Sequence, residues 1–189
     1  MDISQIDKYV LLILKSNGWS EHRDFHLADD WIHKIEQNGV PCFDCAKRIL
    51  HSLGGIKIRE PSPKVAQYFL KKCNGDRKQL KKWYLRPLTI LESLKEKSSF
   101  EMYTGATFQF DALNAFWNQE IVIDIKTAEK RIGERLFPIG TVEPDGISYA
   151  AEKGSIYTLF DDSIFLSGDN IESYLNMLFI KQIKPKQIM

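Results

Sequence analysis

The sequence has little of what secreted, disulfide-stapled or membrane-spanning proteins need. Its 189 residues include three cysteines, which cannot all pair, and a chain of this length builds a hydrophobic core without disulfides. The apolar run at residues 10–14 has five residues, far fewer than the roughly 20 that cross a bilayer. Residues 1–4 lack the positive charge that begins a signal peptide. We therefore expect a cytoplasmic protein with one domain.

An excess of charge of one sign is also missing, because 26 Lys and Arg residues face 25 Asp and Glu residues. The charges are nevertheless separated along the chain. Residues 64–86 hold eight basic residues and one acid, and the tail after Ile180 adds three lysines. Residues 136–180 hold seven acids and one lysine. Such an acidic region is typical of a surface that meets a basic partner, or of turns that use Asp and Glu for solubility.

Motifs that carry chemistry are few. Cys42 and Cys45 form a C-x-x-C pair, but a redox pair of this type is expected after a strand, and a zinc site needs further ligands at suitable spacing. Burial as small apolar side chains is the alternative. His26 and His33 lie seven residues apart, whereas two zinc ligands on one helix are usually four apart. Nucleophile-elbow and phosphate-loop motifs are absent. We predict no enzyme activity, no catalytic residue, no metal and no cofactor.

The N-terminal part of the chain predicts three helices and a strand. Asp2 or Ser4 caps a first helix that runs to about residue 16, and a second helix covers residues 27–37. Pro41 is placed at the first position of a third helix, whose apolar stripe ends at two consecutive glycines. The alternation at residues 56–58 then predicts a short half-buried strand.

From residue 136 onward the apolar period changes to two, which indicates strands. Short strands at 147–151, 156–160 and 164–166 alternate with turn residues, and Ser167 or Asp169 caps a closing helix. Helices followed by an antiparallel meander indicate an α+β fold. The middle of the chain predicts helices at 65–73 and 80–97 and strands at 107–110 and 121–125.

Six short motifs occur in the order expected of one family. Together they resemble the signature of the SUKH superfamily of immunity proteins, its third group in particular, over residues 10–60 and 105–180. The motifs are Gly18-Trp19 with Arg23, Gly54-Gly55-Ile56, Phe110-Asp111, Leu136-Phe137-Pro138-Ile139-Gly140 after Gly133, Gly154-Ser155-Ile156-Tyr157, and Leu166-Ser167-Gly168.

The resemblance implies a single SUKH-like domain at residues 1–180, with N-terminal helices packed on a twisted, mostly antiparallel sheet and with a C-terminal helix. Residues 61–105 are then a helical insertion and residues 181–189 a basic tail. The family strand is either 108–110 or 121–123.

The resemblance also implies a function and a partner. Proteins of this family bind and neutralise the C-terminal domain of a cognate toxin from a bacterial polymorphic toxin system, commonly a nuclease or a nucleic-acid deaminase. They do so by binding, and no catalytic residues carry over. Neither a membrane nor a nucleic acid is then expected as a direct partner.

We predict that the toxin-binding surface lies on the acidic turns at residues 143–162. Carboxylates can occupy the phosphate site of a basic nuclease, and aromatic side chains supply anchors. This surface comprises Asp145, Tyr149, Glu152, Tyr157, Asp161 and Asp162. The rival surface lies in the basic segment and comprises Lys81, Lys82, Trp83 and Tyr84. The alternative function is a nucleic-acid-binding module that uses residues 64–86.

Overall fold

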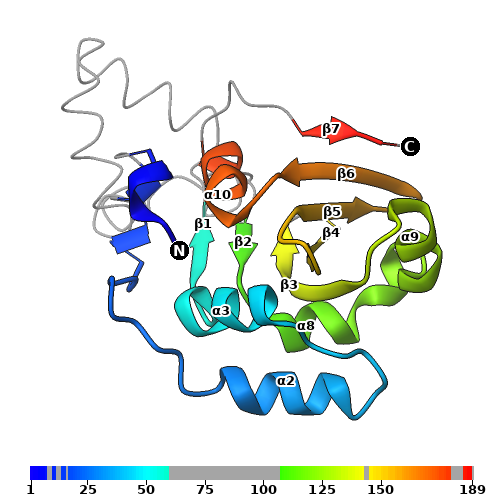
Figure 1. The fold of residues 1–189 in the computed structure, drawn as a ribbon, viewed down its shortest axis with the longest axis horizontal. Helices are drawn as coiled ribbons and strands as arrows, with labels where there is room; N and C mark the ends of the chain where they lie inside the picture. The colour runs from blue at the N-terminus through cyan, green and yellow to red at the C-terminus, as the bar shows by residue number, and fades with distance from the viewer. Residues whose placement is uncertain are drawn as a thin grey trace, which may run out of the picture.

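The computed structural model describes residues 1–7, 10–11, 14–15, 17–59, 107–142, 145–179 and 185–188. Its centre is a seven-stranded antiparallel sheet in which the strands follow one another in sequence order (Figure 1). The strands are β1 (Lys57–Arg59), β2 (Thr107–Gln109), β3 (Leu136–Val142), β4 (Gly146–Ala151), β5 (Ile156–Phe160), β6 (Ser163–Gly168) and β7 (Lys186–Gln187).

The described helices enclose two hydrophobic cores against the sheet. Helices α2 (Ala28–Glu36), α3 (Asp44–Leu53) and α10 (Ile171–Phe179) pack into the first core, and α9 (Ile125–Ile132) packs into the second. Figure 1 shows α9 at one end of the molecule, apart from α2 and α3. Helix α8 (Ala112–Trp117) contributes to both cores, and the short 3₁₀ helices are η1 (Ile3–Gln5) and η2 (Gln119–Ile121). The predicted α+β fold is therefore confirmed, with helices before β1, between β2 and β3, and after β6.

Strand β4 lies in the middle of the sheet and is buried along its whole length. Successive side chains of a strand point to opposite faces, so the two faces of β4 enter different layers. Ile147, Tyr149 and Ala151 pack into the second core, and Ala150 packs into the first. A strand that is covered on both faces offers no side chain to a partner. A partner can therefore reach β4 only through the turns at its two ends.

A buried cluster of hydroxyl groups joins α10 to the strands of the meander. The Tyr174 hydroxyl lies 2.6 Å from Oγ of Ser148, which lies 3.2 Å from Oγ1 of Thr158. Oγ of Ser167 donates to the same Thr158 oxygen over 2.8 Å. All four residues are buried, and buried polar groups that satisfy one another fix a single arrangement of the elements that carry them.

The glycine pair that follows α3 is required by close packing. Gly55 has a φ of +76°, which disfavours side chains, and a Cβ added at Gly54 would lie 2.5 Å from Cδ1 of Phe25. Arg23 donates from Nη2 to the carbonyl oxygen of Gly54 and lies 5.3 Å from the ring centroid of Phe25. Nε1 of Trp19 donates to the α3 residue Ser52 over 3.2 Å. Two of the six sequence motifs therefore meet in space as a folding junction.

Most of the predicted elements are confirmed. The second and third helices, the strand after the glycine pair and the strand near residue 108 are α2, α3, β1 and β2. The meander and its closing helix are β3 to β6 and α10, with Tyr174 and Leu175 buried in the core.

The predicted strand at residues 121–125 is wrong. Ile121 ends η2, Val122 makes a single parallel bridge to Asp161, and Asp124 begins α9 by accepting a hydrogen bond from the backbone N–H of Thr127 over 3.0 Å. The apolar residues here form a short link between two helices, in which Val122 is buried. The strand on this side of the sheet is therefore β2.

The first helix does not begin where we predicted. Asp2 caps η1, and Ile6 has an extended backbone, so the helical residues 10–11 and 14–15 follow a break.

Two helix starts within the main body also differ from the prediction. Helix α3 begins at Asp44 rather than at Pro41, because Phe43 is extended and places its ring 6.3 Å from that of Phe137. The cap of α10 is Asn170, whose Oδ1 accepts the N–H of Ser173 over 2.8 Å. Neither Ser167 nor Asp169 has this role, since the Ser167 hydroxyl is used in the buried cluster.

The predicted insertion at about 61–105, with its helices at 65–73 and 80–97, lies outside the described residues. Of the predicted basic tail, residues 186–187 form β7 and pair with β6.

The hydroxyl cluster leads to a stability prediction. Replacing Tyr174→Phe leaves the ring in place and removes one buried hydrogen bond, so we expect the free energy of unfolding to fall by about 1–2 kcal/mol. The matched control is Tyr157→Phe, since no described residue bonds to that hydroxyl, and we expect a change below about 0.5 kcal/mol. Urea denaturation followed by circular dichroism measures both. Equal effects of the two substitutions would contradict the cluster's role.

Candidate functional site

The four predicted acidic residues lie at two different ends of the meander. Asp145 precedes Gly146 of β4, which is paired with Phe160 of β5, and Asp161 and Asp162 form the next turn. Glu152 lies in the turn at the other end of β4. Six strand residues separate the two ends by about 17 Å. The predicted surface is therefore divided, and three of its carboxylates stay together.

Two further acids join these three. The backbone N–H of Ile123 donates to the carbonyl oxygen of Asp161 over 2.7 Å, which brings the link between η2 and α9 to this turn. All five acidic side chains are exposed, and none of them forms an ion pair with a described residue. We call this surface the acidic end: Glu120, Asp124, Asp145, Asp161 and Asp162.

The turn at Asp161 has an unusual backbone. Asp161 has a φ of +46°, a region that Asp and Asn adopt more readily than most residues. Asn in its place would therefore keep the turn and remove the charge.

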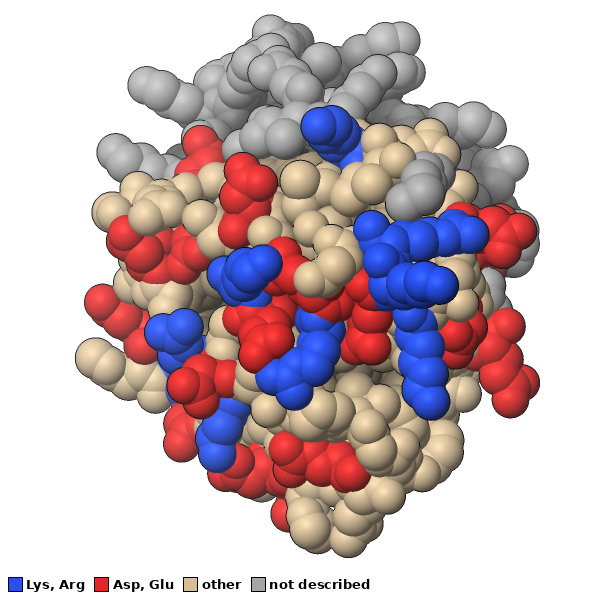
Figure 2. Space-filling view, turned by 45° about the vertical axis from the view of Figure 1, so that its right-hand side comes forward, with Lys and Arg blue, Asp and Glu red and all other residues tan. Residues whose placement is uncertain are grey.

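The opposite end of the meander has compensated charges. Arg135 donates two hydrogen bonds to the Glu152 carboxylate, from Nε over 3.0 Å and from Nη2 over 2.5 Å. This pairing lowers the pKa of the Glu152 carboxyl. Nζ of Lys153 lies 3.7 Å from Oε1 of Glu134. With these two carboxylates beside cations, this end presents little net charge to a partner. Figure 2 shows acidic and basic side chains interleaved on the face that includes α9.

The two predicted aromatic anchors are not on the surface. Tyr149 is fully buried and Tyr157 is 8% exposed, and both pack into the second core. Burial raises the pKa of the Tyr149 hydroxyl, which forms no hydrogen bond with a described residue. The alternation of β4 and β5 turns both rings inward, so neither can anchor a partner as predicted.

A different aromatic residue is exposed. Trp117, the last residue of α8, keeps 62% of its surface accessible. The sequence analysis did not select it, because apolar spacing alone does not distinguish a core tryptophan from an exposed one. The available signal was the polar run that follows Trp117 immediately, Asn118-Gln119-Glu120.

The thiols of Cys42 and Cys45 have the properties of packed side chains. Burial raises the pKa of Cys42 to about 11 and also raises the pKa of Cys45. Sγ of Cys45 donates to the carbonyl oxygen of Ala151 over 3.1 Å, which ties α3 to β4. Reactive thiols have lowered pKa values, so the redox interpretation is not supported. Among the described residues no group of three or more His, Cys, Asp or Glu side chains is arranged to hold a metal ion.

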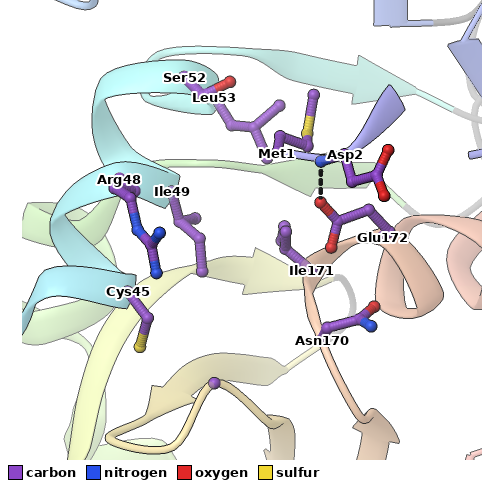
Figure 3. Close-up of a pocket in the computed structure, with 11 residues that line it drawn as sticks. Met1, Asp2, Cys45, Arg48, Ile49, Ser52, Leu53, Asn170, Ile171 and Glu172 are labelled. Carbon is purple, nitrogen blue, oxygen red and sulfur yellow. Dashed lines mark hydrogen bonds between the residues drawn. The ribbon is translucent and has the colours of Figure 1, made fainter. Parts of the chain in front are cut away.

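One pocket of about 450 Å³ lies between α3 and the start of α10. Cys45, Arg48 and Ile49 project toward it from α3, while Ile171 and Glu172 come from the opposite side (Figure 3). Oε1 of Glu172 accepts the backbone N–H of Asp2 over 2.5 Å, so this carboxylate already has a partner inside the chain. The described lining places no nucleophile beside a base, and the pocket does not resemble a catalytic site.

The rival surface at Lys81, Lys82, Trp83 and Tyr84, like the whole basic segment 64–86, lies outside the described residues. None of the helices in the described part of the chain has the length and apolar character needed to cross a membrane.

Comparison with known proteins gives a family match. Residues 6–180 match the family model described as SUKH-3 immunity protein. No curated protein and no solved structure matches the chain significantly. The family match covers most of the chain and includes both cores and the acidic end.

The raised pKa of Cys42 leads to a prediction about reactivity. A thiol with a pKa of about 11 instead of the usual 9.0 has roughly one hundredth of the thiolate at pH 8, and the thiolate is the reactive form. Because a thiolate of higher pKa is also more nucleophilic, we expect iodoacetamide to modify Cys42 at least about tenfold more slowly in the folded chain than in urea, as measured by peptide-resolved mass spectrometry. Equal rates would contradict the packed environment.

Proposed function

Because the chain belongs to the SUKH-3 immunity protein family, we propose that it binds the domain of a cognate toxin and occludes the toxin's active site. It acts in the cytoplasm of the bacterium that makes it and needs no catalysis of its own. The toxin is one that acts on nucleic acid, a nuclease or a deaminase. The membership of the family supports the immunity role, and the surface of the chain supports the choice of partner.

The observation that carries the choice of partner is the acidic end. Its carboxylates are exposed and lack ion-pair partners among the described residues, whereas Glu152 at the opposite end is neutralised by Arg135. A domain that binds nucleic acid must hold phosphates, so its active site is basic. Complementary charges speed the encounter of the two proteins and disfavour partners of the wrong charge. The acidic end therefore faces the phosphate-binding surface of the toxin.

Removing the charge of the acidic end tests this proposal. The triple variant Asp145→Asn, Asp161→Asn, Asp162→Asn removes three exposed charges. Each ion pair between such a carboxylate and a cation of the toxin contributes about 0.5 kcal/mol, so we expect toxin binding about tenfold weaker. Most of the loss appears as slower association, because exposed charges act mainly on the encounter. The measurements are biolayer interferometry with an inactivated candidate toxin domain, sought among the genes that neighbour this one, and survival of cells that express the active toxin.

The matched control removes three exposed carboxylates elsewhere, in Glu21→Gln, Asp30→Asn, Asp44→Asn, so that the net charge is the same. A second control, Glu152→Gln, removes one carboxylate at the opposite end of the meander. Both controls are expected to bind and protect like the wild type. If the two triple variants lose the same affinity, or if only Glu152→Gln loses it, the acidic end is not the interface.

A further inference from the structure

We propose that Trp117 is the anchor of this interface and receives an arginine or lysine side chain of the toxin on its indole ring. The inference rests on the proposed function and adds to it a residue and a mode of recognition. It concerns a side chain that the sequence motifs do not include. The partner is a protein surface that presents a cation.

The exposure of Trp117 is the first observation. The indole is 62% exposed, while the other exposed large apolar side chains of the described chain, Met1, Leu27 and Ile188, reach 38–39%. No described residue accepts a hydrogen bond from the indole N–H. The ring of Phe116 meets that of Trp117 edge to face, with 5.0 Å between centroids and an angle of 68°. Phe116 is itself 7% exposed, so a core residue supports the ring.

The position of Trp117 is the second observation. Five residues separate it from Val122, which bridges to Asp161, so the two points lie at most about 18 Å apart along the chain. Glu120 lies on this connection and Asp124 follows Val122 by two residues, and residues 111–125 contain three acids and no Lys or Arg. Trp117 therefore lies within about 11 Å of chain from Glu120 of the acidic end, and the first basic residue that follows it, Lys126, is nine positions away.

These two features together select a cationic partner. The face of an indole attracts a guanidinium or ammonium group, and tryptophan is the best aromatic residue for this contact. Nearby carboxylates can accept the remaining N–H groups of the same side chain. The chain makes such a contact within its own fold, where Arg23 lies 5.3 Å from the ring centroid of Phe25. A nucleic acid would also stack on an indole, but the surrounding carboxylates repel its phosphates.

Binding of the same inactivated candidate toxin domain tests the inference, with isothermal titration calorimetry on the full chain. We expect Trp117→Ala to raise the Kd at least about 30-fold, as truncation of an interface anchor does. Trp117→Phe keeps a weaker π face and is expected to lose less. Trp117→Leu keeps apolar area without a π face and is expected to lose nearly as much as Trp117→Ala. Leu27→Ala is the control and should bind like the wild type.

Each outcome has one meaning. If Trp117→Ala binds within threefold of the wild type, the anchor is refuted and the proposed function stands. If the Phe and Leu variants bind equally, the cation contact is refuted. If the wild type itself neither binds the toxin nor protects cells, the proposed function fails and the inference fails with it. Thermal melts should coincide for all variants, because Trp117 is outside the core, and the comparison then reports binding alone.

Discussion

The central constraint on this molecule is that its middle strands are covered on both faces. Strand β4 is buried from end to end, and the side chains of β4 and β5 alternate between the core beneath α9 and the layer that contains Tyr174. The four hydroxyl groups in that layer satisfy one another, so α10 has one position on the sheet. With both faces occupied, recognition is left to the strand ends and to the helix termini that meet them.

The two ends of the meander differ in charge, because the acidic end holds five carboxylates without a cation among its own residues, whereas the opposite end pairs its carboxylates with Arg135 and Lys153. Glu152 and its neighbours are paired with cations, and the pair of Glu152 with Arg135 is bidentate. The acidic end has no such partners among the described residues, and the exposed indole of Trp117 lies three residues before its Glu120. Unpaired carboxylates beside an exposed aromatic ring form a surface that favours a basic protein. An immunity protein whose toxin holds phosphates needs a surface of this kind.

The fold could be predicted from the sequence because apolar residues recur at every second position in the strands of the meander, and turn residues separate these strands. The family motifs also predicted fold rather than site, since Arg23 and Gly54 serve a packing junction. The surface that we propose as the toxin-binding site was only partly named from the sequence. The turns at Asp145 and Asp161 were identified, but alternation alone does not say which face of β4 is exposed, and here neither face is. Trp117 was missed because exposure depends on how α8 packs, which sequence spacing does not contain.

Hydrogen–deuterium exchange of the full chain, with and without its inactivated toxin domain, tests the central claim most directly. The amides of η2, of the first turn of α9 and of the turns beside Asp145 and Asp161 should exchange more slowly in the complex, since a bound partner excludes water from them. The turn at Glu152 and the pocket beside Arg48 should exchange at the same rate in both states. Slower exchange at Glu152 or Arg48, with no change at the acidic end, would contradict the account.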